Sequence, residues 1–199
     1  MPAAVVTFEF DPIVRIAGLA VRWESIGIAG SILLALLAAA LLARSVPVDS
    51  EGRRLHADDL LSIAVGAVPG AIVGGRIGYA LVHLDYYGGH AAVLFDPTQG
   101  GFQLGLAVVG GMLTGAYVAR VVDAPVGRWA HTAAIPLLIL LGSGKAAMAW
   151  GGSGQGAISS APWATSYAGA GPWGSVAPDL PAQPAQLYES GVALGIAVL

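Results

Sequence analysis

The sequence predicts an all-α protein, a polytopic helix bundle that spans a membrane several times. Hydrophobic residues make up 56% of the 199 positions and charged residues only 11%, whereas soluble domains average about 25% charged residues. The apolar residues fall into several long runs that lack charges, a pattern typical of membrane-spanning helices. We therefore expect about five membrane segments, arranged as a single transmembrane domain over residues 1–199.

The five apolar segments cover residues 25–43, 60–83, 102–119, 132–150 and 187–199. A spanning helix needs about 20 residues, and the first four segments approach or exceed that length. The fifth segment is too short to cross, so we expect it to be incomplete and the chain to be a fragment of a longer protein.

The loop charges predict which side each loop faces. Basic residues follow the first and third segments, and the loops after the second and fourth segments, 84–101 and 151–186, contain none; the basic residues are Arg44, Arg53, Arg54, Arg120 and Arg128. Because cytoplasmic loops are enriched in Lys and Arg, this alternation predicts an extracytoplasmic N-terminus. The loop at 151–186 is interpreted either as an extracytoplasmic segment with interfacial aromatic residues or as a flexible linker.

Small residues recur along two of the segments. Gly66, Gly70 and Gly74 are spaced by four in the second segment, and Gly110 and Gly115 lie in the third. Small residues at helical spacing allow membrane helices to approach closely, so this spacing favours a tightly packed bundle.

Arg76 is the candidate that points most directly to a function. It is the only Lys, Arg, Asp or Glu from Leu60 to His83, and a guanidinium at the centre of a membrane helix costs on the order of 3 kcal/mol. Such a group binds an anionic ligand or forms an ion pair with another segment. Tyr79 lies three residues on, on the same helical face; it either shares that ligand or is an interfacial aromatic residue.

Further candidates lie at the end of the fourth segment and the start of the fifth. Lys145 follows Gly142-Ser143-Gly144 without the spacing of a phosphate-binding loop, and it either binds a lipid headgroup or snorkels to the surface. Gln186, Tyr188 and Glu189 begin the last segment. Glu189 is a possible partner for Arg76 or Lys145, and helix capping is the alternative role for all three.

The sequence contains no motif that indicates other kinds of chemistry. The chain has no cysteine, which excludes disulfides and thiolate ligands. The four histidines show no ligand spacing, no Gly-x-Ser-x-Gly is present, and the basic residues are too few for nucleic acid. No metal and no cofactor is expected.

Five stretches, in order, resemble the prolipoprotein diacylglyceryl transferase family. They are the N-terminal stretch 10–23, the run 74–79 in the second segment, 100–111, 136–144, and the Gln-Leu-Tyr-Glu run within 184–189. The resemblance implies seven membrane helices in the bacterial cytoplasmic (inner) membrane, with the N-terminus outside. It also implies an enzyme that moves the diacylglyceryl group of phosphatidylglycerol to the lipobox cysteine thiol of a preprolipoprotein.

By this resemblance the lipid-binding residues would be Arg76, Lys145, Gly156, Gln186, Tyr188 and Glu189, with Arg76 and Tyr79 as candidate catalytic residues. The chain departs from the family pattern at six positions. Gly105 and Gln183 replace histidines, Lys145 an arginine, Met148 an asparagine, Ser153 a glutamate and Glu24 a tyrosine. These departures leave a second interpretation, a non-catalytic homologue that binds lipid or a partner protein. A small-solute channel is a third interpretation, in which Arg76 and Lys145 line an anion pathway.

Overall fold

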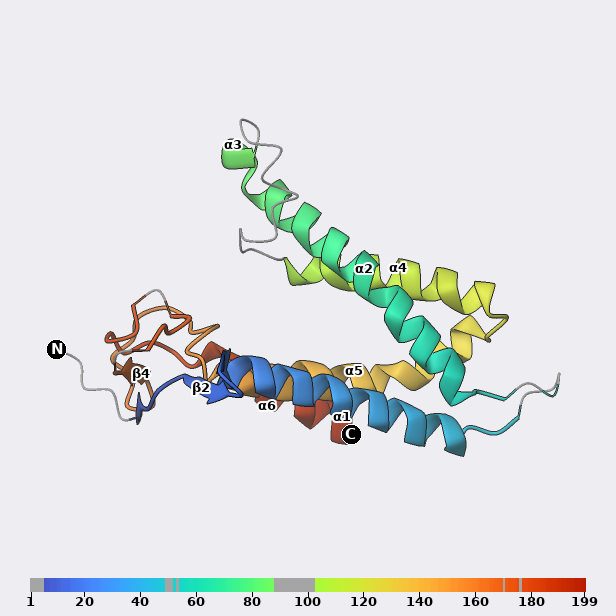
Figure 1. Ribbon diagram of the computed structural model, residues 1–199, viewed down its shortest axis with the longest axis horizontal. Helices are drawn as coiled ribbons and strands as arrows, with labels where there is room; N and C mark the ends of the chain where they lie inside the picture. The colour runs from blue at the N-terminus through green and yellow to red at the C-terminus, as the bar shows by residue number, and fades with distance from the viewer. Residues whose placement is uncertain (1–5, 49–51, 53, 88–102, 170, 176) are drawn as a thin grey trace. The chain divides into compact units, whose positions relative to one another are not determined.

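The computed structural model describes residues 6–48, 52, 54–87, 103–169, 171–175 and 177–199, and these ranges are predominantly helical (Figure 1). The helices are α1 (Trp23–Ser45), α2 (Ala57–Val82), α3 (Leu84–Tyr87), α4 (Leu104–Val121), α5 (Val126–Met148) and α6 (Ala185–Val198). The strands are β1 (Val6–Glu9), β2 (Ile13–Ile16), β3 (Leu19–Arg22) and β4 (Thr165–Ala168). Arg53 and most of the loop expected at 84–101 lie outside the described residues.

The predicted fold class is confirmed. Among the described residues, α1, α2, α4 and α5 are each long and apolar enough to cross a membrane, and α6 overlies the fifth apolar segment with 14 residues. Large apolar side chains of these helices point outward; Leu33 is 68% exposed while Ala35 and Ala39 of the same helix are buried. A helix with small residues inside and leucines outside is typical of contact with lipid, and the protein is a multi-pass membrane protein.

The chain forms two compact units, residues 1–39 with 133–199 and residues 40–132. In the first unit the N-terminal part of α1 packs against α5, and α5 packs against α6 (Figure 1). A Cβ at Gly27 would lie 2.6 Å from the Ala147 Cβ, and one at Gly142 would lie 2.5 Å from the side chain of Leu194. Glycine at these two positions therefore permits both close helix contacts.

In the second unit α2 and α4 cross closely, as the glycine spacing predicts. A Cβ at Gly70 would overlap the carbonyl of Gly110, and one at Gly74 would overlap the carbonyl of Leu106. A small apolar core lies in the same unit, built around Trp129 and Leu55. The interpretation of these glycines as packing residues is confirmed.

The strands were not predicted, and all four belong to the first unit. β1 pairs in parallel with β4, and β2 pairs with β3 as a hairpin that turns at Ala17 and Gly18. Segment 151–186 is thus tied to the N-terminus, and its backbone is further paired where Tyr167 N–H donates to Pro178 O at 2.8 Å. This pairing contradicts the flexible-linker interpretation of that segment. We call β1, β4 and segment 151–184 the cap.

Candidate functional site

Lys145 and Glu189 form an ion pair between the end of α5 and the first turns of α6. Their side chains are 22% and 54% exposed, so the pair lies at an accessible edge of the first unit. A partly exposed pair contributes at most about 1 kcal/mol. An incoming anionic group can therefore compete with Glu189 for Lys145.

Gln183 organises the polar groups beside α6. Its amide oxygen accepts from Tyr188 Oη at 2.6 Å and from Trp163 Nε1 at 3.3 Å, and its Nε2 donates to Ser159 Oγ at 2.7 Å. Gly156 N–H donates to the Gln183 carbonyl at 2.7 Å. Gly156 and Tyr188 are therefore joined through Gln183, and Glu189, next to Tyr188 in the sequence, pairs with Lys145. Gln183 itself was noted from the sequence only as a replaced histidine.

Gln186 lies beneath this surface. It is fully buried, and its Nε2 donates to Tyr167 Oη at 3.3 Å, while its Oε1 has no hydrogen-bond partner in the described structure. Tyr167 is 1% exposed and stacks on Phe8 at a centroid distance of 5.1 Å, and the Trp173 ring is tilted against it at 4.9 Å. Burial raises the pKa of Tyr167 to about 12, partly opposed by the Gln186 hydrogen bond. Gln186 thus holds α6 to the cap as a buried group.

A second polar network ties the start of α1 to the end of α5. Arg22 Nη2 lies 3.1 Å from the Glu24 carboxylate and donates to the Gly151 carbonyl at 3.1 Å. Ser153 Oγ donates to the same Glu24 carboxylate at 2.9 Å. Glu24 and Ser153, two positions where the chain departs from the family pattern, are therefore hydrogen-bonded to each other. No local sequence signal links residues so far apart.

Arg76 and Tyr79 belong to the second unit, on α2. Arg76 is half-buried, and the Tyr79 ring stacks on His83 at a centroid distance of 4.1 Å and meets the edge of Tyr87 at 6.3 Å. The N-terminus of α4 joins α2 nearby, where Gln103 N–H donates to Gly75 O at 2.9 Å. Tyr79 is thus part of an aromatic group at the C-terminal end of α2.

Two other replaced positions have clear surroundings. Gly105 lies in the first turn of α4, where a Cβ would come 2.9 Å from the Gln103 side-chain nitrogen. The Gln103 side chain caps this helix by accepting from Leu106 N–H at 2.6 Å. Met148 is the last residue of α5 and is half-buried, with its methyl group 3.0 Å from the Cβ position of Gly154. Within the described residues, no three His, Asp or Glu side chains form a group able to hold a metal ion.

This chain is similar to known proteins of one family. Residues 12–199 match the prolipoprotein diacylglyceryl transferase family. A phosphatidylglycerol–prolipoprotein diacylglyceryl transferase of Geobacter sulfurreducens is 30% identical over 184 residues, which are 92% of this chain and 66% of that protein. The Streptococcus sanguinis protein of the same name is 33% identical over 109 residues, 54% of this chain and 39% of that protein. The chain spans less than two thirds of the length of either relative. The resemblance seen in the sequence is confirmed, and the chain belongs to the prolipoprotein diacylglyceryl transferase family.

Proposed function

We propose that the protein transfers the diacylglyceryl group of phosphatidylglycerol to the cysteine thiol of a prolipoprotein. The observation that carries the proposal is the accessible Lys145–Glu189 pair, set among hydrogen-bonding groups, in a chain that matches this family over residues 12–199. The relatives' names specify the same two substrates.

The reaction changes the charge on phosphate, and this gives a cation its role. The thiol loses its proton, and its sulfur forms a bond to the glycerol carbon of the diacylglyceryl group. The bond from that carbon to the phosphate oxygen breaks, and its electron pair leaves with glycerol phosphate. A phosphodiester with one negative charge becomes a monoester, which takes up the released proton or carries a second charge. A cation at the phosphate favours the transition state because negative charge grows there.

In this proposal Lys145 binds the phosphate and Glu189 moves from the lysine to a headgroup hydroxyl. Tyr188 Oη and the Gly156 region line the same surface, and Gln186 acts as a positioning residue because it is fully buried. Lysine binds phosphate as a point charge and lacks the fork of the arginine that the family pattern has here. We expect weaker orientation of the phosphate than an arginine would give.

Arg76, on the second unit, is proposed separately as a cation that binds a lipid phosphate, with Tyr79 supporting it from the next turn of α2. An arginine at membrane depth is costly unless it meets an anion or a protein partner. The Arg76→Leu variant should lose phosphatidylglycerol binding, and unchanged binding would assign Arg76 to a structural contact.

For location, we propose the bacterial inner membrane with the N-terminus and the cap outside. The support is the distribution of basic residues. Segment 151–186 has no Lys or Arg, whereas Arg44, Arg54, Arg120 and Arg128 flank the opposite ends of the helices. The proposed thiol substrate would then meet the cap on the extracytoplasmic side.

A non-catalytic homologue is the second candidate, favoured by Gly105 and Met148, which carry no group able to accept a proton or bind a headgroup. Such a protein would bind phosphatidylglycerol without forming a thioether.

Both candidates are tested in cells depleted of their own transferase. The transferase proposal predicts that the protein converts a reporter prolipoprotein to its thioether form, that Lys145→Met abolishes conversion, and that Lys145→Arg retains it. In bilayer nanodiscs, Lys145→Met should weaken phosphatidylglycerol binding about tenfold, because a hydrogen bond to a charged group contributes about 1.5 kcal/mol. Binding without conversion would select the non-catalytic candidate. Equal conversion by Lys145→Met would remove Lys145 from the site.

A further inference from the structure

The β2–β3 hairpin has two chemically different faces. Its register pairs Val14 with Val21 and Ile16 with Leu19. Directly paired residues of an antiparallel hairpin lie on one side, and alternate residues along a strand share that side. One face therefore consists of four apolar side chains, Val14, Ile16, Leu19 and Val21, which we call the apolar face. The other face carries Ile13, Arg15, Ala20 and Arg22.

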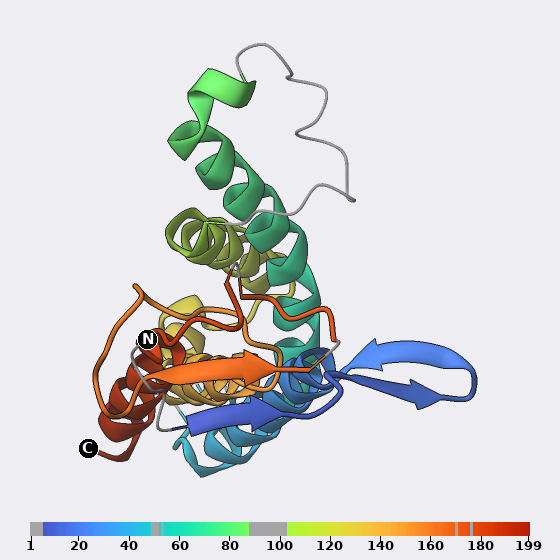
Figure 2. The ribbon, with the colours of Figure 1, turned by 90° about the vertical axis from the view of Figure 1, so that its left-hand side faces the viewer.

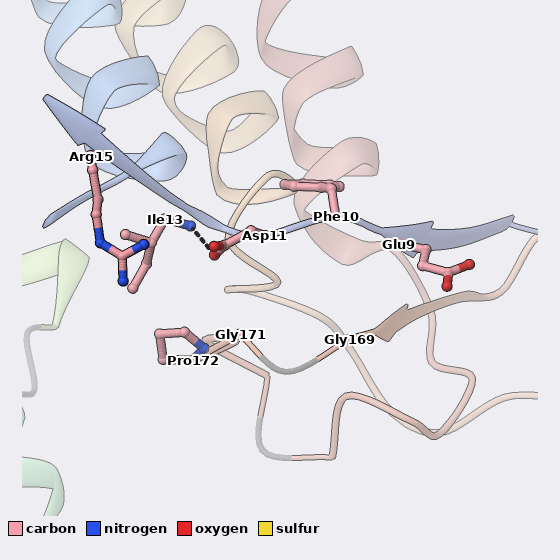
Figure 3. Close-up of a pocket in the computed structure, with 8 residues that line it drawn as sticks. All are labelled: Glu9, Phe10, Asp11, Ile13, Arg15, Gly169, Gly171 and Pro172. Atoms are coloured by element: carbon pink, nitrogen blue, oxygen red, sulfur yellow. Dashed lines mark hydrogen bonds between the residues drawn. The ribbon is translucent and has the colours of Figure 1, made fainter.

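The two faces have different surroundings. On the second face, Ile13 and Arg15 line an open cavity of about 420 Å³, whose opposite wall is formed by Gly171 and Pro172 of the cap (Figure 3). Figure 3 shows the Arg15 side chain on the side of the strand that faces Pro172. On the apolar face, Val14 and Val21 near the base of the hairpin are half-buried, whereas at its tip Ile16 is 52% exposed and Leu19 is 70% exposed.

An exposed apolar face of this kind is stabilised by contact with another apolar surface. In the described structure β2 and β3 pair only with each other, and a lone two-stranded hairpin is marginally stable in water. Figure 2 shows the hairpin extending away from the β1–β4 pair of its own unit. Among the described residues of the first unit, the tip of the apolar face, Ile16 and Leu19, is therefore largely uncovered.

The hairpin is fixed next to the membrane. β3 ends at Arg22, α1 begins at Trp23, and Trp23 N–H donates to Pro12 O at 3.0 Å, which holds the base of the hairpin to the helix start. α1 is one of the helices long and apolar enough to span a bilayer, and Trp23 is 38% exposed at its first residue. Tryptophan at this position is typical of the interface between water and lipid. A strand of four residues extends only about 13 Å, so the whole hairpin stays near that interface.

We infer that the apolar face of the hairpin docks into the lipid surface around α1, with the Arg15 face turned to the cap. The exposed isoleucines and leucines of α1 begin at Ile28, five residues after the hairpin joins the helix at Trp23. This is about 8 Å along the helix axis, so lipid around α1 lies within reach of the apolar face. The hairpin then lies flat at the boundary between headgroups and acyl chains. The hairpin thus lies between the bilayer and the cap.

The absence of cysteine allows a direct test, because one introduced cysteine is labelled uniquely. Leu19→Cys and Ala20→Cys are matched variants, since both residues are exposed and adjacent but lie on opposite faces. Asp179→Cys, on an exposed residue of the cap, serves as the aqueous reference. Each full-length variant of this chain is labelled with a polarity-sensitive fluorophore and reconstituted into phosphatidylcholine and phosphatidylglycerol vesicles. Quenching is measured with lipids that carry a nitroxide below the headgroup and with aqueous iodide.

We expect the label at residue 19 to be blue-shifted, quenched several-fold more by the lipid nitroxide than the label at 20, and protected from iodide. Labels at 20 and 179 should be quenched by iodide. Equal quenching at 19 and 20 would overturn the inference. A label at 19 that is shielded from both quenchers would overturn it too, because protein rather than lipid would then cover the face. Leu19→Asp, unlike Ala20→Asp, should abolish the lipid quenching of a fluorophore on an Ile16→Cys variant.

Discussion

The network that joins Arg22, Glu24 and Ser153 can be tested by a double-mutant cycle. The Ser153 hydroxyl donates to the Glu24 carboxylate at 2.9 Å, and a hydrogen bond to a charged group contributes about 1.5–3 kcal/mol. Arg22 is 37% exposed and Glu24 12% exposed in their 3.1 Å ion pair, so solvent limits that contact to at most about 1 kcal/mol. Glu24→Ala should therefore cost about 3 kcal/mol, and Ser153→Ala about 1.5 kcal/mol.

The double variant should cost about 3 kcal/mol, because either substitution alone already removes the shared hydrogen bond. The coupling of about 1.5 kcal/mol would be measured by thermal unfolding of the reconstituted protein, in which 1 kcal/mol corresponds to roughly 3 °C in Tm. Asp179→Asn changes an exposed cap carboxylate and serves as the control. Strictly additive shifts for Glu24→Ala and Ser153→Ala would refute the argument that these two side chains act as one unit.

Three other consequences can be measured. Because the pKa of Tyr167 rises to about 12 on folding, the phenol ionises first in the unfolded chain. Its contribution to stability is full below pH 10 and is lost as the pH rises from 10 through 12, by roughly 3 kcal/mol. Alkaline unfolding of Tyr167→Phe should lack this component. Ala17 has φ +51° beside Gly18 at φ +85°, so Ala17→Asn should stabilise the hairpin by up to about 1 kcal/mol. This would be measured as slower amide exchange in β2 and β3. Unchanged exchange would contradict the idea that Ala17 is strained. Gly70→Leu should separate α2 from α4 and destabilise the second unit by about 3 kcal/mol or more. A Cβ at Gly30 would have no atom within 4 Å, so Gly30→Leu should leave the unfolding temperature unchanged in the same assay.

The helices were predictable because uncharged runs of about 20 residues are a strong local signal. The glycine spacing also predicted close helix packing, since four-residue spacing places Gly66, Gly70 and Gly74 on one helix face, although the partner helix α4 was not predicted. The pairing of β1 with β4 had no such signal. The partners Phe8 and Tyr167 are distant in sequence, and two strands of four residues are too short to stand out by alternation.

The site was only partly predictable. Residue types indicated polar groups near a helix start, but they did not show which side chains point into the protein and which point to solvent. Gln186 and Glu189 were both read as polar groups at a helix entrance, yet Gln186 is buried and Glu189 is exposed. Helical spacing distinguishes them: Gln186, Ser190 and Ala193 form the buried face of α6. The hairpin was missed because alanine is uncommon at a position with positive φ, so Ala17-Gly18 did not indicate a turn.

The contact between Glu24 and Ser153 changes how the departures from the family pattern are interpreted. Taken singly, Ser153 is a lost glutamate and Glu24 is a lost tyrosine. In the structure they are joined by one hydrogen bond, beside Arg22. Glu24 supplies the negative charge next to Arg22, and an arginine beside a neutral pair would instead remain uncompensated at a partly buried position. Two residues that individually depart from the family pattern thus belong to one polar network. Gly105 and Met148 have no such contact among those described here, and the proposed transferase activity has to be tested with these two residues in place.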